Sequence, residues 1–172
     1  GEAKVVITGK SSLKDLRGIS EPEAIENALS EFDPKDLPEA IVSFGGQTII
    51  AYTIKGKKIV YWYSPNKCGS GTGEFFLQQI KRIGFESVEE ALAAAEEKEA
   101  FENPFVPASR CSVFCKSDCT HALNERKATP AQIVAGICYS IAQNIMKLLA
   151  KTDAKRIWVI GGGSQLQPVI AY

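Results

Sequence analysis

A helical pattern near the carboxyl end constrains the fold of this chain more than any other feature. Thr129 stands where a helix N-cap is expected, and Pro130 occupies the first helical position, where the N–H that proline lacks would have no partner. Over residues 130–151, apolar side chains then recur at helical spacing along one stripe. The stripe consists of Ile133, Val134, Ile137, Ile141, Ile145 and Leu148 or Leu149. The pattern predicts one long helix with an apolar face.

Short apolar runs alternate with helical patterns along the rest of the chain. Apolar runs bounded by turn residues predict strands at residues 3–8, 40–44, 48–54, 58–63 and 157–160. The turn signal Lys55-Gly56-Lys57 predicts that two of these strands form a hairpin. The order of elements is that of an α/β chain.

Capping and breaker residues predict the other helices. They are expected at residues 21–30, from Gly73 onward with Phe75, Phe76, Leu77 and Ile80, at 89–100, and at 111–124. The helix near residue 90 begins with a capping box of Ser87 and Glu90. Its Ala/Glu-rich composition predicts a solvated helix.

Length and charge exclude several classes of function. The chain has 172 residues with 20 basic and 20 acidic side chains, so its net charge gives no attraction to nucleic acid or to an anionic membrane. No apolar run approaches the roughly 20 residues that a membrane helix needs, and the first residues lack a signal-peptide pattern. The number of cysteines, five, is odd, whereas small secreted domains usually carry an even number that pair in disulfides. We expect a cytoplasmic protein whose thiols are free or hold a metal.

Two of the cysteines stand at predicted helix starts. Cys68 directly precedes a glycine run, and Cys111 begins a predicted helix, so the helix dipole would stabilise a thiolate or an anionic cluster at either position. Cys115 and Cys119 follow at four-residue spacing and are expected in the core, as is Cys138 within the long apolar helix. No CxxC pair is present, and His121 is expected to project away from the cysteine stripe, which argues against a zinc site.

Three glycine-rich junctions could approach a ligand. The pair Gly45-Gly46 lies between two predicted strands and makes either a plain turn or a phosphate contact. Residues 69–73 open a helix, where free N–H groups favour an anion, but they match neither the Walker A nor the dinucleotide spacing. Residues 161–163 follow a strand and make either a strand-to-helix turn or a ligand contact.

The cysteine and glycine segments together resemble one known family. Residues 66–76 (NKCGSGTGEFF) are similar to the N-x-K-C-x-x-G-T-G segment of CoA-substrate-specific enzyme activases. These are BadF/BadG/BcrA/BcrD-type ATPases and include activators of 2-hydroxyglutaryl-CoA dehydratase. Residues 110–118 resemble the second cysteine segment of the family. Gly45-Gly46-Gln47 resembles its phosphate segment, and Gly161-Gly162 its adenosine-side glycines.

The resemblance implies a fold and a division of the chain. It implies an actin-like, Hsp70-like ATPase fold with RNase H-like halves, in which helices flank a mixed sheet. Residues 1–39 would be a remnant of the first half, and residues 40–172 the second half, with a cluster-binding helical insertion at about residues 64–128. The nucleotide-binding residues implied are Gly45, Gly46, Gln47, Gly161, Gly162 and Gly163.

The resemblance also implies an ATP-dependent reductive activase. Cys68 and Cys111 from each of two subunits would hold one shared [4Fe-4S] cluster in a homodimer, since a cluster of this kind needs four thiolates. With ATP and magnesium, such a dimer would pass a low-potential electron to an iron–sulfur partner. The partner class implied is a 2-hydroxyacyl-CoA dehydratase or a benzoyl-CoA reductase.

Two departures from the family pattern keep other interpretations open. The acidic, glycine-rich D-x-G-S-T loop of the family has no counterpart, and the chain stops nine residues after Gly163, so we expect part of a larger protein with the ATPase activity in the whole. Ser43 and Thr48 stand where the family commonly has Asp, so no carboxylate there could order magnesium. The alternatives are a non-catalytic iron–sulfur or partner-binding module, and a sugar- or acyl-kinase relative with inert buried cysteines.

Overall fold

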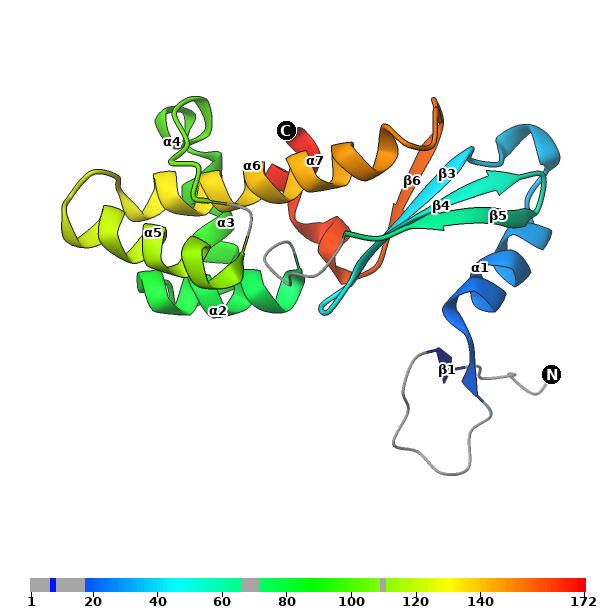
Figure 1. The fold of residues 1–172 in the computed structure, drawn as a ribbon, viewed down its shortest axis with the longest axis horizontal. Helices are drawn as coiled ribbons and strands as arrows, with labels where there is room; N and C mark the ends of the chain where they lie inside the picture. The colour runs from blue at the N-terminus through cyan, green and yellow to red at the C-terminus, as the bar shows by residue number, and fades with distance from the viewer. Residues whose placement is uncertain (1–6, 9–17, 66–71, 109–110) are drawn as a thin grey trace.

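The computed structural model describes residues 7–8, 18–65, 72–108 and 111–172 (Figure 1). Its centre is a four-stranded mixed sheet in the order β5-β4-β3-β6. The strands are β3 (Ala40–Phe44), β4 (Ile49–Lys55), β5 (Lys58–Tyr63) and β6 (Ile157–Ile160). Strand β4 pairs antiparallel with β3 and β5, whereas β6 pairs parallel with β3. The predicted hairpin is confirmed, with Gly56 in the left-handed region at its turn.

Strand β3 is buried on both faces because helices cover both sides of the sheet. Val42 and Phe44 belong to the larger core, which includes the long helix α6 (Pro130–Leu149). Ile41 belongs to a smaller core on the other face, beneath α1 (Glu21–Ser30). Helix α1 begins as predicted at Ser20, whose Oγ accepts a hydrogen bond from Glu23 N. A 3₁₀ helix, η1 (Pro34–Asp36), leads from α1 to β3.

The long helix is confirmed with both of its predicted start signals. Thr129 and Gln132 form a reciprocal capping box, and Pro130 occupies the first turn. The predicted stripe is buried up to Leu148. In Figure 1, α6 begins in a cluster of helices at one end of the molecule and ends beside the sheet, so one helix joins the two parts. After β6, the chain forms the 3₁₀ helix η3 (Gly162–Gln165) and α7 (Gln167–Ala171).

Four further helices pack around α6 away from the sheet (Figure 1). They are α2 (Gly73–Ile83), α3 (Val88–Glu96), α4 (Lys98–Glu102) and α5 (Ser112–Asn124). Helices α2 and α5 begin where they are predicted. Within the residues described, no helix has the length and apolar character needed to cross a membrane.

The prediction of one solvated helix over residues 89–100 is wrong. The chain forms α3 and α4, with a break at Glu97, and Ala91 and Ala95 of α3 are buried on the side that packs against α6. Small side chains explain the difference, because Ala91 and Ala95 let the two helices approach closely. The capping box is also only half formed: Ser87 Oγ accepts from Glu90 N at 3.0 Å, but the Glu90 carboxylate accepts from Glu86 N.

Little of the amino-terminal strand prediction can be compared with the structure. Of the strand expected at residues 3–8, only β1 (Ile7–Thr8) lies within the described part, and it pairs parallel with β2 (Gly18–Ile19). Residues 66–71, which carry the first cysteine motif, also lie outside the described residues.

Candidate functional site

The glycine turns after β3 and β6 lie at the same edge of the sheet. The two strands are parallel neighbours, so their carboxyl ends meet there. One turn, Gly45-Gly46-Gln47, follows β3 and is closed by a hydrogen bond of 2.9 Å from Gly45 N to Thr48 O. The other, residues 161–163, follows β6. The sheet thus brings together the two glycine segments that the sequence singles out as nucleotide-binding candidates.

Two of the glycines after β6 have a structural reason to be glycine. Gly161 has a φ of +91°, and a Cβ there would lie 2.6 Å from Phe44 O. A Cβ on Gly163 would lie 2.3 Å from the buried Phe44 ring. Gly162 has open space around it. Packing against Phe44 therefore accounts for Gly161 and Gly163, while Gly162 is the position that a ligand could approach.

A cavity of about 530 Å³ lies beside both turns. Its size is within the range of small-molecule sites. Gly46, Gly162 and Gly163 line it together, whereas Gly45, Gln47 and Gly161 are not among its lining residues. The other lining residues come mainly from the start of α2, from α3 and from the segment after β6: Gly73, Phe76, Leu77, Val88, Glu89, Leu92, Gln165 and Leu166.

Sequence reasoning missed the apolar wall of this cavity. Leu77 was named among the apolar residues of the helix after Gly73 with no role assigned to it, whereas in the structure 44% of its surface is exposed and it lines the cavity. Its exposure could have been predicted from its position, since a leucine directly after the buried pair Phe75 and Phe76 points away from their side of the helix. Val88 and Leu92 are one helical turn apart on α3, so their side chains lie on the same face of that helix and form the other part of the apolar wall.

The first turn of α2 is attached to the turn after β3. Gly73 N donates to Gly45 O at 3.2 Å and Glu74 N donates to Gly46 O at 2.8 Å. Phe75 N donates to Thr72 Oγ1. The N–H groups of residues 69–73 were expected to be free for an anion, but the N–H of Gly73 is not free, because Gly45 O already accepts its hydrogen. The N–H of Glu74 is bonded to the turn in the same way. Any change in the turn would instead be transmitted to α2.

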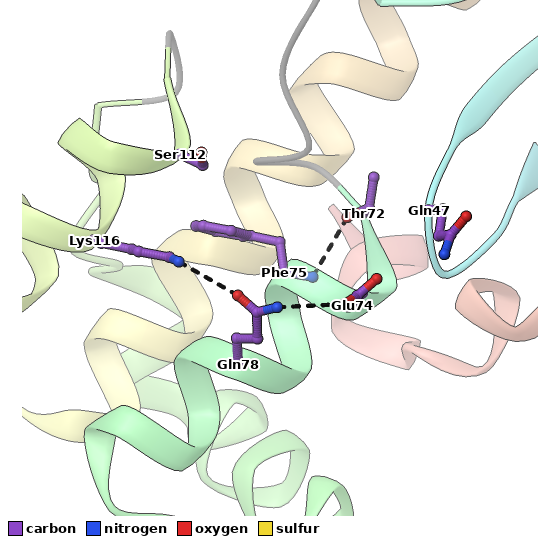
Figure 2. Close-up of a pocket in the computed structure, with 7 residues that line it drawn as sticks. All are labelled: Gln47, Thr72, Glu74, Phe75, Gln78, Ser112 and Lys116. Atoms are coloured by element: carbon purple, nitrogen blue, oxygen red, sulfur yellow. Dashed lines mark hydrogen bonds between the residues drawn. The ribbon is translucent and has the colours of Figure 1, made fainter.

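Figure 2 shows a second cavity, of about 280 Å³, at the start of α2 and α5. Gln47 lies on one side of it and Ser112 on the other. Lys116 Nζ donates to Gln78 Oε1 at 3.3 Å, and Gln78 Nε2 donates to Glu74 Oε1 at 3.4 Å. The cavity therefore links the turn after β3 to the residue that follows Cys111.

Helices α2 and α5 run parallel to each other. Gln78 contacts Lys116, and one turn further along both helices Arg82 donates to Thr120 Oγ1 at 3.1 Å. Their amino ends are consequently at the same end of the pair, and both dipoles present their positive ends there. The segments that carry the two candidate cysteines enter their helices from that shared end.

Cys111 is the N-cap residue of α5, as its predicted helix-start position requires. Its side chain makes no capping hydrogen bond and is partly exposed, so the thiol is available to bind a metal. Cys68 lies outside the described residues. Within the described ranges, no cluster of three or more His, Cys, Asp or Glu residues has metal-binding geometry in one chain.

The remaining cysteines are buried in the core, as predicted. Cys115 and Cys119 are 2% and 3% exposed, and burial raises the pKa of the Cys138 thiol to about 12. A hydrogen bond with Cys115 lowers the pKa of Cys119 against the effect of its own burial. His121 is exposed beside Glu125, away from these thiols.

We expect thiol-specific labelling to separate Cys111 from Cys138. At pH 8 a small alkylating reagent should modify Cys111 rapidly, because the thiol is accessible at the helix start. Cys138 should react at least about a hundredfold more slowly, since little thiolate forms at a pKa near 12 and the core excludes the reagent. Peptide mass mapping over a time course measures both rates, and equal rates would contradict the placement of Cys138.

The sheet, its flanking helices and the paired glycine turns define an α/β domain of the actin-like ATPase type. The model of the BadF/BadG/BcrA/BcrD ATPase family matches residues 23–171, and the chain belongs to that family. The family and the fold class predicted from the sequence are thereby confirmed.

Two dehydratase activators are similar to this chain over nearly its whole length. The 2-hydroxyisocaproyl-CoA dehydratase activator of Clostridioides difficile is 27% identical over 164 residues, which cover 93% of this chain and 59% of that protein. The solved structure of the Clostridium difficile activator with bound ADPNP superposes with a TM-score of 0.81 at 26% identity, covering 98% of this chain and 62% of that one.

A second solved structure shows the same fold at lower identity. Component A of (R)-2-hydroxyglutaryl-CoA dehydratase from Acidaminococcus fermentans has a TM-score of 0.76 at 21% identity, covering 96% of this chain and 63% of that one. The chain thus spans about three fifths of the length of these relatives.

Proposed function

We propose that this chain is part of an ATP-dependent activator of a 2-hydroxyacyl-CoA dehydratase or a related reductase. It would supply the residues that contact adenosine and one subunit's cysteine ligands to an iron–sulfur cluster. The observation that carries the proposal is the hydrogen-bonded connection from the turn after β3 to α2, and from α2 to the helix that Cys111 caps. The relative with bound ADPNP supports nucleotide binding, and the names of both relatives support a dehydratase partner.

The larger cavity suits an adenosine group. Leu77, Val88 and Leu92 supply an apolar wall for a flat base, and Glu89 supplies a carboxylate that can accept a hydrogen bond from a ribose hydroxyl. Phosphates would then extend toward the turn after β3. Since Gly45 N is used within that turn, Gly46 and Gln47 are the better candidates for phosphate contact.

The chain also offers a carboxylate near the proposed phosphate position. Ser43 and Thr48 cannot order magnesium as the aspartates of the family would, but Glu74, in the first turn of α2, is held against the turn after β3 because its N–H donates to Gly46 O at 2.8 Å. We infer that Glu74 takes over part of that role. A non-hydrolysing, partner-binding module is the second candidate function, and the absence of acidic residues at positions 43 and 48 favours it.

The residues at the start of α5 fit a cluster ligand. The Cys111 thiol is partly exposed, makes no capping bond and lies at the positive end of a helix dipole, which stabilises an anionic iron–sulfur group. We propose Cys111 and Cys68, doubled by a two-fold axis in a homodimer, as the four thiolates. A [4Fe-4S] cluster held there would supply a low-potential one-electron donor.

We further propose that the chain divides into two parts. Residues 1–39 would belong to a first RNase H-like half. Residues 40–172 would form a second half with the cluster-binding insertion at about residues 64–128.

Saturation-transfer NMR with adenosine and ADP tests the nucleotide part of this proposal, because it detects weak binding. We expect transfer to the adenine protons in the wild-type chain and at least about tenfold weaker binding in Leu77→Glu, which places a charge on the apolar wall. Val60→Glu is the matched control, since Val60 on β5 is similarly exposed, at 49%, and does not line the cavity. Equal loss in both variants, or none in either, would reject the cavity as the adenosine site.

A further inference from the structure

A third cavity lies between α2 and α5, about two helical turns beyond the ends that carry the candidate cysteines. Its volume is about 270 Å³, just below the usual range for drug-sized ligands. The residues that matter for its chemistry are Gln79, Arg82, Ile83, Cys119, Leu123 and Asn124. The proposed nucleotide and cluster sites do not use it.

Gln79 gives this cavity a buried donor. Its side chain is only 1% exposed, and among the described residues its Nε2 atom has no hydrogen-bond partner. A buried amide without a partner is unfavourable, so native proteins satisfy nearly all such groups with protein, water or ligand atoms. Gln79 lines the cavity, and its unpartnered Nε2 is the donor that a hydrogen-bond acceptor bound there would satisfy.

Arg82 adds a positive charge in a fixed orientation. Its guanidinium donates to Thr120 Oγ1 at 3.1 Å, and the Thr120 hydroxyl in turn donates to Lys116 O at 2.8 Å. No carboxylate in the described part of the chain lies within ion-pair distance of Arg82. Asp118, the nearest acidic residue along α5, accepts from Ala108 N instead.

We propose that this cavity binds a short aliphatic carboxylate. One carboxylate oxygen pairs with the Arg82 guanidinium and the other accepts from Gln79 Nε2, with the Asn124 amide as a further donor from α5. The alkyl chain lies against Ile83, Leu123 and the Cys119 thiol. A single guanidinium and an apolar wall suit a monoanion with a carbon chain better than a phosphate dianion.

Such a ligand would hold α2 and α5 in one relative position. Arg82 and Gln79 belong to α2, whereas Asn124 and Leu123 belong to α5, so the bound carboxylate contacts both helices. These are the two helices that follow the proposed cluster ligands, which makes the cavity a candidate regulatory site. The binding itself needs neither iron nor nucleotide, so it can be tested independently of the proposed function.

Isothermal titration calorimetry of the wild-type chain with sodium butyrate at pH 7.5 and constant ionic strength tests the proposal. Arg82→Gln should weaken binding about tenfold or more, because it removes a charge-assisted hydrogen bond. Lys81→Gln is the matched control: it removes the same charge one residue earlier on α2, outside the cavity, and should bind as the wild type does. Butyramide, which lacks the charge, should not compete.

A second readout uses the cysteine in the cavity wall. Cys119 is only 3% exposed, so it should react far more slowly than Cys111. Butyrate should slow its alkylation by iodoacetamide several-fold further while leaving the rate at Cys111 unchanged, and Gln79→Leu should lose most of this protection. The proposal is wrong if the wild-type chain shows no binding heat, if Arg82→Gln and Lys81→Gln behave alike, or if butyramide binds as well as butyrate.

Discussion

Replacing Gly136 with alanine should destabilise the chain by about 3 kcal/mol, although alanine is the better helix former. Gly136 lies in the buried middle of α6, where the backbone of the segment after α4 crosses the helix. A Cβ at this position would lie 1.6 Å from Phe105 O and 2.3 Å from Phe105 C. Both of these are backbone atoms, so no side-chain rotation relieves the clash.

The crossing segment cannot shift without losing its own bonds to the helix. Phe105 N donates to Gln132 O at 2.9 Å, and Gln132 Nε2 donates to Asn103 O at 3.3 Å. A displaced segment would lose the hydrogen bond from Phe105 N to Gln132 O, which joins two partly buried residues, and this loss adds to the cost of the clash. It would also disturb the approach to α5, because the same segment leads to Cys111.

Urea unfolding monitored by far-ultraviolet circular dichroism measures this effect. Gly46→Ala is the matched control, since a Cβ there meets nothing within 4 Å and Gly46 has no left-handed backbone. It should change the free energy of unfolding by less than about 0.5 kcal/mol. If Gly136→Ala unfolds at the wild-type urea concentration, the close crossing of residue 105 over α6 is incorrect.

Gly136 also illustrates what sequence reasoning could not provide. The start of α6 was predictable because Thr129, Pro130 and Gln132 act within one turn, and its stripe followed from helical spacing alone. The requirement for glycine at position 136 comes from a segment thirty-one residues earlier in the chain, which no local pattern reveals. The same limit explains the wrong prediction for residues 89–100, since α6 decides which alanines of α3 are buried.

The candidate site was predictable in its motifs but not in its geometry. The glycine segments after β3 and β6 could be named from the sequence, and only the parallel pairing of these strands places them at one edge. The apolar wall of Leu77, Val88 and Leu92 could not be found in this way, because it is formed by elements that meet only in the folded chain. Gly161 and Gly163 were predicted as ligand contacts, yet each also has a packing role against Phe44.

Replacing Cys111 with alanine should remove nearly all protein-bound iron. After anaerobic reconstitution with iron and sulfide, we expect the wild-type chain to carry about four iron atoms per dimer. The variant would lose two of the four proposed thiolates at once, because the proposed two-fold axis would repeat each substitution. Iron, acid-labile sulfide and the visible absorption of the cluster should therefore all fall to near background, and the dimer should dissociate in light scattering.

This substitution should change iron binding without changing the stability of the fold. The Cys111 side chain makes no capping hydrogen bond, so alanine removes none, and the free energy of unfolding without iron should change by less than about 0.5 kcal/mol. Cys138→Ala is the control, because it removes a thiol that is buried in α6 and should retain the full iron content. Cys115→Ala tests the next thiol on α5 in the same way. Full iron in Cys111→Ala, or loss of iron only in Cys115→Ala, would show that the thiol at the start of α5 is not the ligand. The proposed connection from the turn after β3 through α2 to α5 would then not end at a cluster.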